Sequence, residues 1–186
     1  MRYIFLITSL FAAWSMSGQE LERRGFVIGL GLGAGMIDIQ DHGTETAFAA
    51  TPGVLSLPNL KIGFMLSERT ALLATFPGAI YEYEGRDRSF EAFLPTIQHW
   101  VGKRWWINGG AGLAMDFPAF YDMKGLEDPQ VHVGYALVAA AGFELVQGRR
   151  FALDVQTRVQ YGRVNLGDSA YREGCVATVG LGVNWY

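Results

Sequence analysis

The stretch "GCVATVGLGVNWY" at residues 174–186 alternates strictly between two kinds of side chain. One phase is apolar and mostly bulky: Cys175, Ala177, Val179, Leu181, Val183 and Trp185. The other phase is mostly small or polar: Val176, Thr178, Gly180, Gly182 and Asn184. A period of two residues predicts a β-strand whose two faces meet different surroundings.

The same alternation recurs along the chain and predicts eight strands in all. The clear segments are residues 26–36, 59–66, 105–117, 132–145, 151–162 and 175–185. Two further segments, near residues 70–84 and 90–101, alternate less cleanly, so their phase stays open. Pro95 predicts a bulge in the second of these, because proline cannot donate to a strand ladder.

The connections between these segments differ in length at the two ends of the strands. Tight turns are expected at residues 67–69, 102–104 and 148–150, and longer links near 41–53, 84–89, 118–130 and 165–173. Short turns at one end and longer loops at the other are typical of outer-membrane barrels. The predicted fold is therefore all-β: an eight-stranded antiparallel up-and-down transmembrane β-barrel with both termini at the short-turn end.

The beginning of the chain predicts an export signal. Arg2 is followed by an apolar run from Ile4 to Ala13, which is shorter than the roughly 20 residues of a transmembrane helix. Small residues precede the predicted cleavage near Ser17. We expect residues 1–17 to be removed, residues 18–24 to form a short N-terminal segment and residues 25–186 to form the barrel.

Composition excludes several functional classes. The net charge is −3 and the chain has no block of Lys and Arg residues, so no nucleic-acid partner is expected. The single cysteine, Cys175, cannot form an internal disulfide, and three scattered histidines without a cysteine partner predict no metal site. No cofactor is expected, and Cys175 is expected to face lipid.

Alternation alone allows two kinds of barrel. A soluble, lipocalin-like binder would enclose the apolar phase, whereas a membrane barrel turns that phase outward. The small phase is mostly Gly and Ala rather than the Lys and Glu of a water-facing sheet, which favours the membrane barrel. Aromatic residues near the strand ends favour it too, because they predict two belts at the membrane interfaces. The expected belt residues are Trp100, Trp105, Tyr135, Tyr161 and Trp185.

The polar phase predicts a lumen filled by side chains, because eight strands leave no open channel. Its expected polar network comprises Lys61, Asn108, Glu144, Asp154, Gln156, Arg158 and Gln160. Pairing the strands about Arg149 sets Glu144 opposite Asp154. Two neighbouring carboxylates also suit acid–base catalysis. We favour a buried network with Arg158 and Lys61 as counter-ions, because a packed lumen admits no substrate.

Three stretches carry a family resemblance: "HWVGKRWWINGGAGLA" (99–114), "AGFELVQGRRFALDVQTRVQYG" (141–162) and "VGLGVNWY" (179–186). They resemble the bacterial outer-membrane β-barrel family, the small OmpX-type barrels with a porin-family β-barrel domain. The resemblance spans essentially the whole mature chain and implies the outer membrane of a Gram-negative bacterium. In this family the last strand addresses the chain to the barrel-assembly machinery, which implies that Trp185 or Tyr186 is read as that signal.

The expected role is that of a monomeric scaffold embedded in outer-membrane lipid, with loops that contribute to envelope integrity or surface interaction. A lumen blocked by Trp106, Arg158 and Gln160 would favour this role, and we expect no enzymatic activity. The first alternative is passage or binding of a small hydrophobic molecule through a lateral or narrow lumen path.

The further alternative is a lipid-modifying enzyme of the outer membrane. Such an enzyme needs a hydroxyl activated by a base that is itself oriented. His132 and Asp116 lie at the loop ends of neighbouring predicted strands, and Ser169 is the nearest candidate hydroxyl. A hydrogen bond between His132 and a loop serine would favour this alternative.

Overall fold

The computed structural model describes residues 21–45, 48–56, 58–123 and 129–186; the predicted signal at residues 1–17 lies outside them. The described chain forms one antiparallel sheet of eleven strands. These are β1 (Phe26–His42), β2 (Ala49–Ala50), β3 (Gly53–Leu55), β4 (Asn59–Ser67), β5 (Thr70–Phe76), β6 (Gly78–Tyr83), β7 (Arg86–Trp100), β8 (Trp105–Pro118), β9 (His132–Gln147), β10 (Phe151–Gly167) and β11 (Ala170–Trp185). In these residues no helix is long and apolar enough to cross a membrane.

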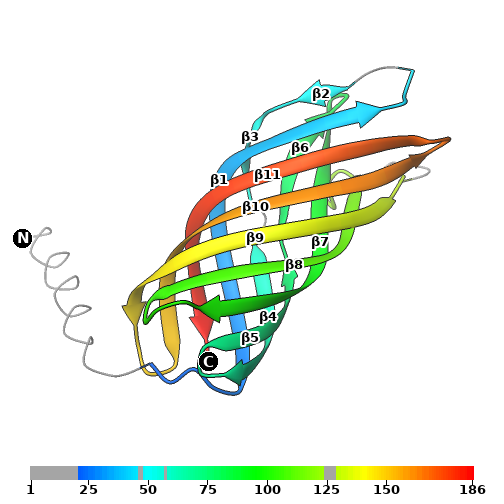
Figure 1. Ribbon diagram of the computed structural model, residues 1–186. Coiled ribbons are helices and arrows are strands. Elements are labelled where there is room, and N and C mark those ends of the chain that lie inside the picture. Colours follow the sequence, from blue (N-terminus) through cyan, green and yellow to red (C-terminus); the bar gives the residue numbers. More distant parts are fainter. Residues whose placement is uncertain (1–20, 46–47, 57, 124–128) are drawn as a thin grey trace, which may run out of the picture.

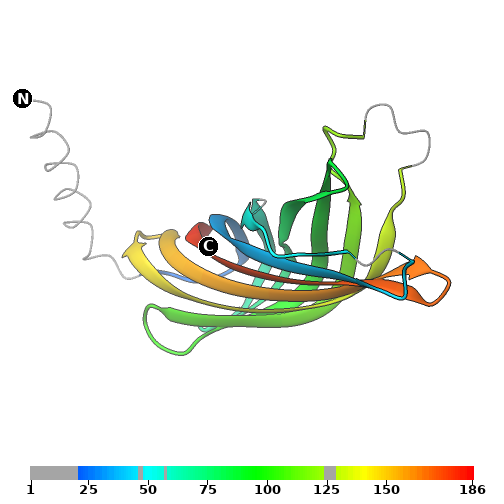
Figure 2. The same cartoon turned by 90° about the horizontal axis from the view of Figure 1, so that it is seen from above.

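The sheet closes into a ring, because β11 pairs with both β10 and β1 (Figures 1 and 2). The closing ladder with β1 runs from Ile28–Trp185 to His42–Tyr171. Short strands share two positions of the ring: β2, β3 and β4 all pair with β1, while β5 and β6 both pair with β7. The ring therefore has eight positions, and the predicted eight-stranded up-and-down barrel is confirmed.

The alternation sorts side chains between the two faces of the wall. Leu32, Val179 and Leu181 point outward and are 58%, 61% and 54% exposed, whereas Asp154 and Gln160 are fully buried in the lumen. A contiguous apolar outer surface of this kind suits lipid rather than water. It contradicts the lipocalin-like alternative, which requires the apolar phase inside.

β7 settles the phase of a segment that the sequence leaves open. Leu94 and Gln98 are buried, whereas Ile97 and His99 point outward. The predicted bulge at Pro95 is wrong. The ladder to β8 lacks pairs at Leu94 and Pro95 but keeps the same register on either side, so the pairing is interrupted there without a shift of the strand.

Two connections at the loop end are shorter than expected. The predicted links near residues 84–89 and 165–173 are instead two-residue turns, at 84–85 between β6 and β7 and at 168–169 between β10 and β11. Their residues have positive φ: 52° and 76° in the first turn, and 47° and 70° in the second. Positive φ at both positions matches the twist of a hairpin, which lets these strands extend where loops were expected.

Candidate functional site: the barrel lumen

At the short-turn end the lumen is built around the carboxylate of Glu144, which is fully buried. It accepts hydrogen bonds from the Arg23 guanidinium at 2.5 Å and from Trp100 Nε1 at 2.8 Å. Gln147 Nε2 and Tyr186 OH also donate to it, at 2.5 and 3.3 Å. A buried charge needs a counter-ion and hydrogen bonds, and Arg23 supplies the counter-ion here.

Arg23 belongs to the short segment before β1 and was not expected in the lumen. Its guanidinium lies 4.8 Å from the centre of the Trp100 ring and also donates to the backbone oxygen of Lys103. The expectation that Arg158 and Lys61 neutralise both carboxylates is therefore wrong for Glu144. Strand periodicity carries no information about a side chain that enters the lumen from outside the strands.

Trp100 lies inside the lumen, so its predicted place in an aromatic belt is wrong. The side chain is fully buried and bonds to Glu144. The cause is the phase of β7, which turns Gln98 and Trp100 inward and His99 outward.

Asp154 lies directly opposite Glu144 in the β9–β10 ladder, as predicted. Its Oδ2 accepts hydrogen bonds from Trp106 Nε1 at 3.1 Å and Asn184 Nδ2 at 2.8 Å. Lys61 Nζ lies 4.3 Å from the centre of the Trp106 ring. The two carboxylates thus have separate donors, and the arrangement is a packed network rather than an open acid–base pair.

The middle of the lumen holds the rest of the predicted polar residues. Gln156 Oε1 accepts from Lys61 Nζ at 3.2 Å, and Asn108 Nδ2 donates to Thr96 Oγ1 at 3.0 Å. Both amide atoms of the fully buried Gln160, and Nε of Arg158, have no partner in the described part of the chain. The predicted network is therefore tightly bonded near the short turns and loosely bonded at mid-height.

The half of the lumen nearer the loops is apolar, which was not expected. Its buried cluster comprises Ile37, Ile39, Val54, Ala79, Tyr81, Phe90, Ala92, Leu94, Ala114, Ala136, Val138, Val164 and Val176. Phe90 crosses this space toward the opposite wall. A Cβ added to Gly162 or Gly174 would lie 2.8 or 2.7 Å from its ring, so these glycines make room for the ring.

A buried ionic network closes the loop end of the lumen. Arg172 bonds both oxygens of Asp41, at 2.5 and 2.7 Å, and reaches Asp116 at 3.2 Å. Asp116 also accepts from Arg88 at 2.5 Å and from Tyr81 OH at 2.6 Å. These residues come from five different strands. This meeting is not predictable from the sequence, because each residue lies near a strand end and its partners lie on other strands.

Residues of the β8–β9 connection lie beside this network. Tyr121 OH donates to Asp87 at 2.8 Å, and the backbone N–H of Asp87 donates to Asp122 at 3.0 Å. The hydrogen bond to the Asp87 carboxylate raises the pKa of Tyr121. These contacts attach the connection to the start of β7.

The candidate catalytic residues do not assemble. Asp116 is engaged by Arg88, Arg172 and Tyr81, and His132 lies across from it in the β8–β9 ladder. No hydrogen bond joins His132 to Ser169 in the described residues. A different hydroxyl, Thr70 Oγ1, lies 3.0 Å from His99 Nδ1 on the outer face. The described residues include no carboxylate bonded to His99 and no cluster of metal ligands.

The other expected belt residues lie on the outer face. Trp105, Tyr135 and Trp185 are 57%, 50% and 47% exposed, and Tyr161 is half-buried with its OH bonded to Glu173 at 2.8 Å. Tyr186 differs from Trp185, because its ring packs against Trp100 at 5.8 Å between centroids. Of the two candidates for an assembly signal, only Trp185 therefore faces outward.

Comparisons with known proteins agree with this architecture. No family model and no curated protein matches the sequence. The solved structures that match the fold include two small barrels from other bacteria. The attachment invasion locus protein Ail of Yersinia pestis is 12% identical, with 86% of this chain and 99% of that chain covered and a TM-score of 0.52. Neisserial surface protein A is 15% identical, with 87% and 96% covered and a TM-score of 0.52.

At these identities the likeness concerns the fold alone. The class it defines is that of the small eight-stranded outer-membrane β-barrels, in agreement with the resemblance in the sequence. The specific role of this chain must be argued from its own lumen and surface.

Proposed function

We propose that the protein is a monomeric scaffold of the outer membrane, with a lumen closed to solutes and loops that face the outside. The observation that carries this proposal is the filling of the lumen at three levels. Charged groups around Glu144 occupy the short-turn end, the apolar cluster with Phe90 follows, and the Arg172 network occupies the loop end. No cofactor and no catalytic step is part of this role.

The outer surface supports the membrane location. Apolar side chains cover the wall, and the outward position of Trp105, Trp185 and Tyr135, with Tyr161 half-buried, supports our proposal that these four residues form the two interfacial belts. We further propose that residues 1–17 are the export signal and that Trp185, with Tyr186, is read by the barrel-assembly machinery.

Planar-bilayer recording tests the closed lumen. The purified barrel is expected to give no steady conductance, because side chains occupy the lumen along its length. A stable single-channel conductance in the wild-type barrel would contradict the scaffold role and favour passage.

A specific feature of the wall favours the second candidate, which is binding or passage of a small hydrophobic molecule. Within the described residues no ladder joins β3 to β6, and one isolated bridge, between Ser56 just after β3 and Ala79 of β6, connects this part of the wall; we call it the seam. A pocket of about 440 Å³ opens on the outer wall next to it, lined by Leu30, Pro58, Leu60, Phe76, Gly78 and Glu91. The apolar part of the lumen lies behind this seam, with Val54 and Ala79 in its cluster.

A reversible crosslink tests this candidate. Ser56→Cys with Ala79→Cys, in a Cys175→Ser background, would join the seam when oxidised. If the seam is a path, oxidation lowers the uptake of a fluorescent apolar dye into cells, and reduction restores it. A cysteine pair at Ala111 and Leu137, within the continuous β8–β9 ladder, is the matched control. Equal uptake in both redox states would exclude the seam as a path.

A further inference from the structure

The short-turn end of the barrel carries a concentration of positive charge, which we call the basic rim. It comprises Arg24, Arg69, Lys103, Arg104, Arg149 and Arg150. These residues lie in the segment before β1 and in the β4–β5, β7–β8 and β9–β10 turns, all at one end of the barrel (Figure 1). The acidic residues beside them outside the lumen are Glu22 and Glu68. The opposite end is rich in carboxylates, so the molecule is electrically asymmetric along its axis.

Most of these cations are not neutralised by the protein. Arg24 forms an ion pair of 3.1 Å with Glu22, and both side chains are exposed. Arg104 reaches only the backbone oxygen of Leu145, at 3.4 Å. The side chains of the remaining rim residues, Arg69, Lys103, Arg149 and Arg150, have no hydrogen bond or ion pair within the described part of the chain. An exposed ion pair such as that of Arg24 contributes little, so the rim is free to bind anions.

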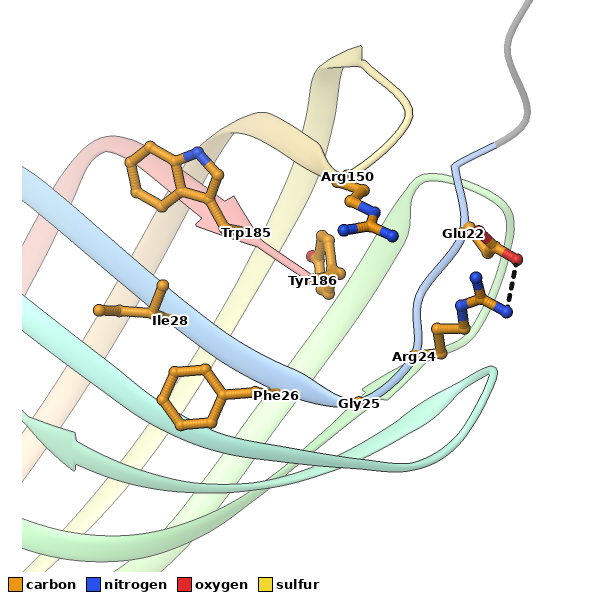
Figure 3. A pocket seen from close by; sticks show the side chains of 8 residues that line it. All are labelled: Glu22, Arg24, Gly25, Phe26, Ile28, Arg150, Trp185 and Tyr186. Atoms are coloured by element: carbon orange, nitrogen blue, oxygen red, sulfur yellow. Dashed lines mark ion pairs between the residues drawn. The ribbon is translucent and has the colours of Figure 1, made fainter.

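One place on the rim is also a pocket. It has a volume of about 500 Å³ and lies where β1 begins beside the end of β11. Figure 3 shows its two sides. Phe26, Ile28 and Trp185 lie together on the side of the strand wall, while the Arg150 guanidinium and the Glu22–Arg24 pair lie toward the N-terminal segment.

We propose that the basic rim binds the headgroup phosphates of anionic phospholipids in the leaflet next to the short turns, with this pocket as its best-formed site. The proposal rests on the membrane embedding proposed above. Guanidinium groups are suited to phosphate, which they bind by charge-assisted hydrogen bonds. Phe26 and Ile28 continue the lipid-facing apolar surface, so an acyl chain can lie along the wall below a bound headgroup. Trp185 lies with them on the wall side of the pocket (Figure 3), and tryptophans at such a position sit at the level of the lipid headgroups.

The continuity of the pocket with the outer wall favours a lipid over an acidic protein. A soluble acidic partner would contact the arginines but would leave Phe26, Ile28 and Trp185, which are 50%, 39% and 47% exposed, without a matching surface. A phospholipid offers a phosphate to the arginines and an acyl chain to the apolar side of the pocket.

Native mass spectrometry of the folded barrel in a neutral detergent tests the proposal. Phosphatidylglycerol and phosphatidylcholine are titrated separately onto the wild type, onto Arg150→Gln and onto Arg86→Gln. Arg86 is an exposed arginine at the other end of the barrel, so its variant has the same charge change. We expect phosphatidylglycerol to bind more tightly than phosphatidylcholine. Arg150→Gln should weaken phosphatidylglycerol binding about fivefold and Arg86→Gln should leave it unchanged, since each arginine near an anionic surface contributes about that factor.

Equal binding of the two lipids by the wild type, or equal loss in both variants, would overturn the proposal. Tighter binding of soluble poly-glutamate than of phosphatidylglycerol would overturn it too and indicate an acidic protein partner. If Arg150→Gln does not fold, the salt dependence of the wild type tests the proposal. The preference of the wild type for phosphatidylglycerol over phosphatidylcholine must then disappear in about 0.5 M NaCl, because salt screens exposed charges. A barrel that fails to fold in phosphatidylcholine vesicles would instead refute the membrane embedding itself.

Discussion

At the scale of single residues, the most consequential group is the buried carboxylate of Glu144. It lies in the lumen with no exposed surface, and its ion pair comes from Arg23, a residue outside every strand. The side chain of Arg23 is only 11% exposed there. The N-terminal segment therefore contributes to barrel stability through the contacts of Arg23 with Glu144, Trp100 and the backbone oxygen of Lys103.

Removal of that contact is expected to destabilise the barrel strongly. Arg23→Ala leaves the Glu144 charge buried without a counter-ion, which costs on the order of 3 kcal/mol. Urea unfolding followed by tryptophan fluorescence measures the change. Arg24→Ala is the matched control, because Arg24 is 68% exposed and pairs only with Glu22, so a change within about 0.5 kcal/mol is expected.

The double variant Arg23→Ala with Glu144→Gln separates charge from packing. It should recover part of the lost stability, because no uncompensated charge then remains in the lumen. Equal stability of Arg23→Ala and Arg24→Ala would show that the Arg23–Glu144 pair does not support the fold.

At the scale of elements, β7, β10 and β11 meet across the lumen through one ring. Phe90 of β7 fills the space that Gly162 of β10 and Gly174 of β11 leave open. A glycine inside a strand normally weakens it. At these two positions the absence of a side chain leaves space for the Phe90 ring, which is part of the buried apolar cluster.

Substitution of Gly174 by alanine should therefore lower stability. Its new Cβ would lie 2.7 Å from the Phe90 ring, and such overpacking costs about 1–3 kcal/mol. Gly109→Ala is the control, because that glycine is also in a strand and its Cβ would meet only the Val138 backbone oxygen at 3.6 Å. Adding Phe90→Leu should restore the stability of Gly174→Ala, measured by the same urea midpoint. No difference between the two alanine variants would contradict this account of the packing.

The elements also show what alternation can and cannot predict. In β10 and β9 the alternation puts the polar residues on the lumen face, and the pairing of Asp154 with Glu144 is the one that a count about Arg149 predicts. The ladder also has a register shift between Leu153 and Asp154, which the alternation does not predict. In β7 the alternation is blurred by Pro95 and by apolar residues on both faces. The phase of Trp100 was consequently missed.

The ends of the lumen could not be predicted in the same way. Arg172, Asp41 and Asp116 meet because the tilt and stagger of the strands bring their ends together around the ring. The alternation of residues within one strand predicts neither the tilt of that strand nor its stagger against its neighbours. Arg23 was missed for a related reason, since a residue before the first strand has no phase at all.

At the scale of the whole molecule, the barrel is asymmetric in both packing and charge. Its lumen passes from a bonded polar network at the short turns to an apolar cluster, and a second ionic network closes the loop end. Cations are concentrated on the rim at the short turns. Such an arrangement suits a protein that is fixed in one orientation across a bilayer and conducts nothing.

The gel mobility of the protein after fractionation shows whether the chain forms a closed barrel inside the outer membrane. The full-length chain is expressed in a Gram-negative host, and outer membranes are run in SDS with and without boiling. We predict that the protein is in that fraction and that the unboiled sample migrates faster, because a closed barrel with all its strands paired resists unfolding by the detergent. A mature chain that is soluble in the periplasm, with the same mobility before and after boiling, would contradict a barrel embedded in the outer membrane.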